Sequence, residues 1–434
     1  MDAEKIEVYC RLWEQAKIFC RALSELAEEP ENKQALDAAS RSFPELQPHL
    51  SDTLRDHILY LFSGAEIEAG DLRKAGGRLL NELSGTVCKS VAQLADGRAY
   101  LGRSEAEKVF ALWDKIPHVN KSVYQGIFEC CMKASASAPM QAFQHTLQIF
   151  EEQPQLLSGK ETPHPGYVYR ASEQQTFDRC PICGGNGKPY YSAFSYEMAD
   201  FSYPHLPVKL WMACGSCGNL YTWKYPKDLL RYSDNEEMIK PDLTKKLTAT
   251  AGASGMSLPI WSNVLNKLSV YSKGKELLEV GIGQGELLAV ALEMGYQPDA
   301  VEIVPAAARK VADMLGISIW RGDFLNYAPK KIYSVIIMGD VIEHVTDPEK
   351  ALRNAYDLLE EDGVLWLSTP NFESSFSRMM KFHDPMWLEP YHISYFNRAG
   401  LEALASKCGF ILREYSVSQR YNGSMELILT KRQR

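Results

Sequence analysis

Three side chains that can exchange a proton or bind a metal ion lie close together in the stretch Asp-Val-Ile-Glu-His-Val, at Asp340, Glu343 and His344. A strongly apolar run precedes them. A second candidate, His392, follows in Glu-Pro-Tyr-His-Ile-Ser-Tyr-Phe, with Tyr391 beside it. Such groups can remove a proton from an acceptor or hold a divalent ion. We therefore take Glu343 and His344 as candidate catalytic residues.

Four cysteines form a second group, one that could bind a metal ion. Cys180 and Cys183 make one C-x2-C pair, and Cys214 and Cys217 make another after 30 intervening residues. Glycines flank both pairs, so backbone amides can approach the thiolates. This spacing predicts a closed tetrahedral zinc site. Because four protein ligands leave no open position, the zinc would hold structure, and we expect a small zinc ribbon over residues 171–230.

A glycine-rich turn is the third candidate. Gly281, Gly283 and Gly285 alternate directly after an apolar stretch, which permits a tight turn and close approach of the backbone to a ligand. The acidic Glu279 before them disfavours a phosphate and favours a ligand with a cation. Glu302 follows Gly281 at a spacing that suits hydrogen bonds to ribose hydroxyls. The turn therefore predicts a nucleoside-like ligand with a positive group.

The surrounding elements must bring these residues together. Residues 256–434 alternate strand and helix patterns, which predicts a doubly wound, mainly parallel α/β sheet that binds ligands at the carboxyl ends of its strands. Apolar spacings of three and four predict an all-helical domain of six to eight helices over residues 1–155, and a linker follows at 156–170. The expected strands lie at 275–280, 298–304, 317–324, 333–340, 363–371, 410–419 and 425–432.

In this order the motifs resemble the class I S-adenosylmethionine-dependent methyltransferases over about residues 256–434. The resemblance implies a Rossmann-like, seven-stranded methyltransferase domain that follows the zinc ribbon and the all-α domain. It also implies S-adenosylmethionine as cofactor, with Asp340 among the residues that bind it. The implied cofactor contacts are Gly281, Gly283 and Gly285 to the methionine part, Glu279 to its amino group, Glu302 to the ribose, Asp323 to the adenine amine and Phe324 beside the adenine.

Two subsets of the family give different chemistry at the candidate catalytic residues. The small-RNA 2′-O-methyltransferases and the ubiquinone-pathway O-methyltransferases are similar in D/E-x-x-E-H and a later His, which implies Mg²⁺ at Asp340, Glu343, His344 and His392. The ribbon followed by a methyltransferase also resembles deoxysugar C-methyltransferases, in which His392 or Tyr391 would be the base. The aromatic stretch 371–392 is expected to cover the site as a lid or acceptor pocket.

Composition limits the remaining alternatives. The 434 residues carry a net charge of −8, no basic run, no apolar run of membrane-spanning length and no signal-peptide core, so we expect a soluble cytoplasmic protein and not a nucleic-acid binder. The leading hypothesis is a biosynthetic O-methyltransferase of a small molecule or saccharide. The alternatives are C-methylation of a keto-deoxysugar, an RNA methyltransferase, or a zinc-ribbon adaptor without catalysis. The helical domain would mediate oligomer or protein contacts.

Overall fold

The computed structural model describes most of the chain in two compact units. One unit comprises residues 1–159 with 191–193, and the other comprises 160–190 with 194–434. The expected linker at 156–170 and the limits between the expected domains lie largely outside the described residues, so those limits stay a prediction. The structure describes residues 3–63, 68–95, 106–107, 131, 133–154, 171–195, 205–227, 258–380 and 384–432.

The described part of the first unit is helical, and the helices at 33–46 and 52–61 begin at polar caps. The backbone N–H of Ala35 donates to Asn32 Oδ1 (3.0 Å) and that of Leu54 donates to Ser51 Oγ (3.3 Å), which satisfies amides that have no partner within the helix. The helices are α1 (Ala3–Glu28), α2 (Lys33–Leu46), α3 (Asp52–Leu61), α4 (Ala69–Ala95) and α7 (Pro139–Glu152), with a short 3-10 helix at Gln47–His49.

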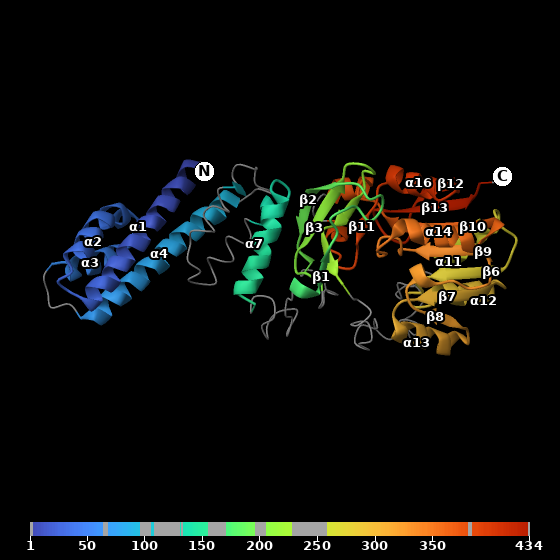
Figure 1. Ribbon diagram of the computed structural model, residues 1–434, viewed down its shortest axis with the longest axis horizontal. Coiled ribbons are helices and arrows are strands. Elements are labelled where there is room, and N and C mark those ends of the chain that lie inside the picture. Colours follow the sequence, from blue (N-terminus) through green and yellow to red (C-terminus); the bar gives the residue numbers. More distant parts are fainter. Residues whose placement is uncertain are drawn as a thin grey trace. The chain divides into compact units, whose positions relative to one another are not determined.

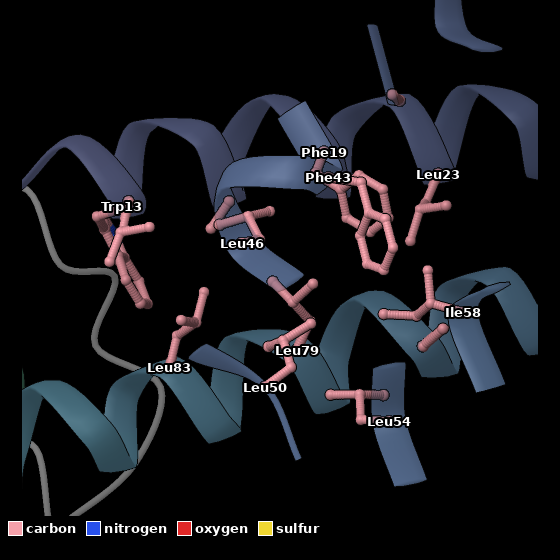
Figure 2. Packing of buried hydrophobic residues seen from close by; sticks show 14 of the residues in the cluster. Trp13, Phe19, Leu23, Phe43, Leu46, Leu50, Leu54, Ile58, Leu79 and Leu83 are labelled. Carbon is pink, nitrogen blue, oxygen red and sulfur yellow. The ribbon is translucent and has the colours of Figure 1, made fainter. Parts of the chain in front are cut away.

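One apolar core holds α1 to α4 together. Figure 2 shows Trp13 and Phe19 of α1 facing the side where Leu79 and Leu83 of α4 lie. Phe19 stacks on Phe43 of α2 with 5.3 Å between ring centroids. Buried apolar residues recur at spacings of three and four along α1 (12, 16, 19, 23, 26) and α4 (72, 75, 79, 83), which puts them on one face of each helix. The expected helical character is confirmed for this described region.

The second unit contains a seven-stranded mixed sheet in the order β12-β13-β10-β9-β6-β7-β8 (Figure 1). β13 runs antiparallel to β10 and β12, whereas β10, β9, β6, β7 and β8 pair in parallel. This confirms the predicted Rossmann-like sheet. The strands are β6 (Glu276–Val280), β7 (Gln297–Glu302), β8 (Ile319–Arg321), β9 (Tyr333–Gly339), β10 (Leu359–Pro370), β12 (Phe410–Val417) and β13 (Ser424–Lys431).

Helices connect these strands and bury the sheet. Trp261 and Leu265 of α11 pack in one cluster with Leu277, Val335 and Trp366 from the strands. No helix in the described ranges is long and apolar enough to span a membrane. The helices are α11 (Leu258–Leu268), α12 (Glu286–Glu293), α13 (Pro305–Leu315), α14 (Pro348–Leu358), α15 (Ser375–Met380) and α16 (Arg398–Lys407).

A smaller sheet carries the cysteines and includes a strand from the other end of the chain. Its order is β11-β4-β3-β2, and a separate pair joins β1 to β5. β11 begins two residues after His392, so the ribbon sheet is completed by the segment that carries a candidate catalytic residue. The strands are β1 (Gln174–Thr176), β2 (Gly187–Ala193), β3 (Lys209–Cys214), β4 (Leu220–Thr222), β5 (Lys224–Pro226) and β11 (Ser394–Tyr395).

Candidate functional site

The glycine turn joins β6 to α12 at the carboxyl edge of the large sheet. Gly281, Gly283 and Gly285 have φ values of 76°, 52° and 83°, a region that L-residues with a side chain rarely adopt. A Cβ at Gly281 would lie 2.7 Å from Val341, and one at Gly285 would lie 2.6 Å from Val311. A Cβ at Gly283 would meet no atom within 4 Å. The lack of a side chain at Gly281 and Gly285 therefore leaves room for Val341 and Val311. Gly283 instead borders open space that a ligand can fill.

Glu279 lies two residues before this turn with its carboxylate buried. Its Oε2 has no hydrogen-bond partner among the described residues, and the residue is 4% exposed. Burial raises the pKa of Glu279 well above its usual range, and the positive charge of Arg420 opposes that rise. A buried polar oxygen without a partner is costly. A cationic group bound at the turn would satisfy it.

Glu302 ends β7 and ties it to the turn. Its Oε2 accepts a hydrogen bond from the backbone N–H of Ile282 (3.1 Å), and its Oε1 accepts one from Val304 (2.8 Å). Burial raises the pKa of Glu302, and these two hydrogen bonds oppose the rise. The side chain therefore fixes the edge of the site. Its expected contact with a ribose stays a prediction.

Asp323 and Phe324 follow β8 at the same edge. Asp323 Oδ1 accepts a hydrogen bond from the backbone N–H of Leu325 (2.9 Å), which caps the 3-10 helix Phe324–Asn326. Phe324 is buried, and its carbonyl accepts a hydrogen bond from Asn354 Nδ2 (3.1 Å). Asp323 therefore has a local structural role in addition to the adenine contact predicted for it.

Asp340 follows β9 in an unusual backbone conformation. Among the described residues it is the one non-glycine residue with positive φ, at 56°. Ser368 Oγ donates to its Oδ1 (2.9 Å), and Arg420 Nη1 lies 2.8 Å from its Oδ2. Burial raises the pKa of Asp340, and Arg420 opposes that rise. These contacts stabilise a backbone conformation that by itself costs about 1–3 kcal/mol. They also fix the direction in which the chain continues after Asp340.

The next residues meet His392. One potential ligand atom from each of Glu343, His344 and His392 lies within 4.8 Å of the other two. Glu343 Oε2 accepts a hydrogen bond from Thr369 (2.9 Å), and His344 Nδ1 lies 3.1 Å from the carbonyl of Tyr391, to which it must donate. Glu343 Oε1 and His392 Nδ1 have no partner among the described residues. The structure thus brings together three of the four predicted catalytic side chains, whereas Tyr391 contributes a carbonyl.

Burial sets the protonation of this cluster. It raises the pKa of Glu343 well above its usual range, and the nearby Asp340 adds to the rise. It also lowers the pKa of His392 well below its usual range, and the positive charges of His344 and Lys209 add to that effect. These shifts favour a protonated Glu343 and a neutral His392. A neutral imidazole nitrogen without a partner can accept a proton.

Residues 259–415 match the family model of a methyltransferase domain. Those residues form a methyltransferase domain. The predicted methyltransferase domain is confirmed over this range. Its four motif regions, at the ends of β6, β7, β8 and β9, lie at one edge of the sheet, as the doubly wound fold requires.

Curated relatives match part of this domain. A ubiquinone biosynthesis O-methyltransferase of Actinobacillus pleuropneumoniae serotype 5b (strain L20) is 33% identical over 111 residues, which are 23% of this chain and 47% of that protein. A ubiquinone biosynthesis O-methyltransferase of Caulobacter vibrioides (strain ATCC 19089 / CIP 103742 / CB 15) is 27% identical over 109 residues, which are 23% of this chain and 42% of that protein. The chain spans about half the length of the curated relatives it matches.

Solved structures are similar at lower identity. The CcbJ methyltransferase of Streptomyces caelestis is 15% identical with a TM-score of 0.35, covering 40% of this chain and 90% of that one. The mitomycin 7-O-methyltransferase MmcR is 18% identical with a TM-score of 0.37, and the match covers 48% of this chain and 61% of that one.

The ribbon holds the methyltransferase segment that carries His392. Lys209 Nζ, from β3, donates to the carbonyl of Glu389 (2.6 Å) and to that of His392. The Tyr225 hydroxyl donates to the carbonyl of Tyr391 (3.1 Å). Lys209 is buried, and burial lowers its pKa to about 7. Lys209 was not among the predicted site residues, although a lysine in the apolar stretch Lys-Leu-Trp-Met-Ala-Cys is an unusual feature that could have indicated it.

The four cysteines have the geometry of a metal site. Sγ of Cys180 lies 3.8 Å from that of Cys217, Sγ of Cys183 lies 3.4 Å from that of Cys214, and all four lie within 4.8 Å of one another. Sulfurs around zinc at about 2.3 Å are about 3.8 Å apart in a tetrahedron, whereas a disulfide needs about 2.05 Å. The hydrogen bond between Cys180 and Cys217 lowers the pKa of Cys217 and raises that of Cys180, as expected for two thiols that share one proton without a metal ion. The cluster therefore fits zinc.

The residues at the candidate active site fit magnesium poorly. Asp340, expected as a fourth ligand, pairs with Arg420 and is not part of the described cluster of Glu343, His344 and His392. That cluster offers one carboxylate and two imidazoles, whereas Mg²⁺ prefers oxygen ligands in octahedral geometry.

Proposed function

We propose that the chain methylates a hydroxyl group of a small molecule or saccharide with S-adenosylmethionine as donor. The observation that carries this proposal is the unpartnered Nδ1 of His392, a buried imidazole whose neutral form is favoured, in contact with His344 and close to Glu343. A hydroxyl loses its proton poorly without such a base.

The cofactor pocket is supported by three features of the glycine turn. Gly283 borders open space, Glu279 presents an unpartnered carboxylate oxygen, and Glu302 holds the neighbouring strand end against the turn. The ammonium group in the methionine part of S-adenosylmethionine would donate a hydrogen bond to the unpartnered carboxylate oxygen of Glu279. When bound, the cofactor supplies the methyl group on a positively charged sulfur.

The protein's part in the reaction is alignment and proton removal. The acceptor oxygen forms a bond to the methyl carbon as the carbon–sulfur bond breaks, and the hydroxyl proton passes to His392 Nδ1. Thr369 holds Glu343, and the carbonyl of Tyr391 holds His344, so the neighbours of the base have fixed positions. A general base of this kind contributes about 10²–10⁴ in rate, and alignment of the two reactants contributes further.

Transfer to oxygen is favoured over the alternatives by the names of the matched relatives, which are O-methyltransferases. Carbon methylation of a keto-sugar is the second candidate, because the cysteine ribbon pairs with β11 beside His392 and would border the same acceptor. In that reaction His392 would take a proton from the carbon next to the ketone.

The test has a binding arm and a transfer arm. Isothermal titration of the full chain with S-adenosylmethionine should show binding for wild type, His392→Ala and the control His57→Ala. Incubation with methyl-labelled cofactor and panels of phenols, sugars and keto-sugars should label an acceptor, and NMR of the product separates O-methyl from C-methyl. We expect His392→Ala to lower turnover at least about 100-fold and His57→Ala to leave it unchanged. A wild-type chain that fails to bind the cofactor contradicts the proposal.

A further inference from the structure

Arg420 reaches the carboxyl edge of the sheet from the connection between β12 and β13. Its guanidinium lies 2.8 Å from Asp340 Oδ2 and 3.4 Å from Ser368 Oγ, and both contacts use Nη1. The side chain is 13% exposed. Its Nε is buried and has no hydrogen-bond partner among the described residues. A guanidinium has five N–H donors, so these two contacts leave most of its capacity unused.

The guanidinium lies directly beside the glycine turn. A Cβ added to Gly339, the last residue of β9, would lie 2.9 Å from Arg420 Nη1. β9 pairs in parallel with β6, with Val280 opposite Met338, so Gly339 continues next to the first residue of the turn. The centroid of the Trp261 ring lies 4.4 Å from the guanidinium carbon, a cation–π contact that helps to hold the side chain. The cation is thus held at the place where the proposed pocket begins.

This edge therefore presents one positive and one negative group with unsatisfied hydrogen-bonding capacity. Glu279 has a buried oxygen without a partner, and Arg420 has a buried Nε–H without one. The two are close enough for the charge of Arg420 to lower the pKa of Glu279. The complementary ligand is a zwitterion, with an ammonium and a carboxylate on neighbouring atoms. The methionine part of S-adenosylmethionine has both groups on one carbon.

We infer that Arg420 binds the carboxylate of the cofactor while Glu279 binds its ammonium group. The inference rests on the proposed use of S-adenosylmethionine at this site. Arginine binds a carboxylate through two parallel N–H groups, and the edge of the guanidinium that carries Nε can provide such a fork while Nη1 keeps its contact with Asp340. The alternative role, in which Arg420 only neutralises Asp340, leaves the buried Nε–H without a function.

Isothermal titration with two ligands tests this pairing. The full-length chain is titrated with S-adenosylmethionine and with decarboxylated S-adenosylmethionine, which keeps the ammonium and lacks the carboxylate. We expect wild type to bind the decarboxylated ligand at least tenfold more weakly, the range of about 10–100-fold being typical of a lost charged hydrogen bond. Arg420→Met should bind both ligands with the same affinity. Arg413→Met, which loses an exposed arginine of β12 bonded to Thr430, should discriminate as wild type does.

The two arms separate the inference from the proposal on which it rests. If wild type does not bind S-adenosylmethionine, the proposed function fails. If wild type binds both ligands equally well, or if Arg420→Met still discriminates between them, the carboxylate is bound elsewhere and only the inference is overturned. The wild-type arm needs no variant. The double variant Arg420→Met/Asp340→Asn, which leaves no unpaired buried charge, repeats the measurement should Arg420→Met be unstable.

Discussion

The ammonium of Lys209 donates to the backbone carbonyl of Glu389 at 2.6 Å, across 180 residues of sequence. The same group also donates to the carbonyl of His392. A buried residue of the cysteine ribbon thus holds the backbone on both sides of Tyr391, next to the candidate base. β4 and β11 extend this attachment as a pair of strands. The ribbon therefore fixes the segment from which the His392 side chain projects.

Replacing Lys209 with methionine should loosen this segment. Two buried carbonyls would lose their donor, at about 1–3 kcal/mol each, and the relief of burying an ammonium would offset part of that cost. We expect a net loss of about 1–2 kcal/mol in the free energy of unfolding, measured by urea denaturation. Hydrogen exchange over residues 384–397 should become faster.

The matched control for that variant is Lys227→Met. Lys227 belongs to the same ribbon, is exposed and donates to the carbonyl of Ser172 (2.8 Å). Exposed substitutions of this kind usually change stability by less than about 0.5 kcal/mol. Equal behaviour of the two variants in exchange and denaturation would show that Lys209 does not support the segment.

The stability contributed by Lys209 should depend on pH in a defined direction. Burial lowers its pKa to about 7 in the folded chain, whereas an unfolded lysine titrates near 10.4. Between these values the unfolded chain binds more protons, so the folded state gains stability as pH rises. Wild type should gain about 1.4 kcal/mol per pH unit relative to Lys209→Met above pH 7. Denaturation of both proteins at pH 7 and 8.5 measures this, and a difference that stays flat or falls would mean that the buried amine remains charged.

Local signals in the sequence were sufficient for the fold and for part of the site. Each of these signals is contained in a short stretch of sequence, so the local structure could be predicted from it. They are the alternating glycines at 281–285, the apolar strand before Asp340 and the two cysteine pairs. Lys209 and Arg420 differ, because the groups they contact are distant in sequence and, for Lys209, are carbonyls that any residue carries. β11 has two residues, too few to show an alternating pattern.

Gly283→Ala should remove cofactor binding with little effect on the fold. Gly283 has φ 52° and Gly316, at the end of α13, has φ 66°, and a Cβ at either position would meet no atom within 4 Å. Alanine costs about 1 kcal/mol of backbone strain at each position. Only at Gly283 would the methyl group enter the proposed pocket, so titration with S-adenosylmethionine should show at least a tenfold loss there and none for Gly316→Ala. Similar affinities for the two variants would place the cofactor away from the turn.

Removing one cysteine should affect the active-site segment through the ribbon. Wild type should contain about one zinc ion per chain by mass spectrometry of the metal, because the four sulfurs lie within 4.8 Å of one another and can bind one ion. Cys183→Ser should lose the zinc, whereas Cys408→Ser, a buried thiol next to the carbonyl of Glu349, should keep it. Since β3, β4 and the turn between them carry both the cysteine pair at 214–217 and contacts to residues 389–395, zinc loss should speed hydrogen exchange in that segment. Zinc loss with unchanged exchange there would show that the metal does not support the segment. If the wild-type chain contains no zinc, then the metal does not support this segment, and only Lys209 and the β4–β11 pair attach it to the ribbon.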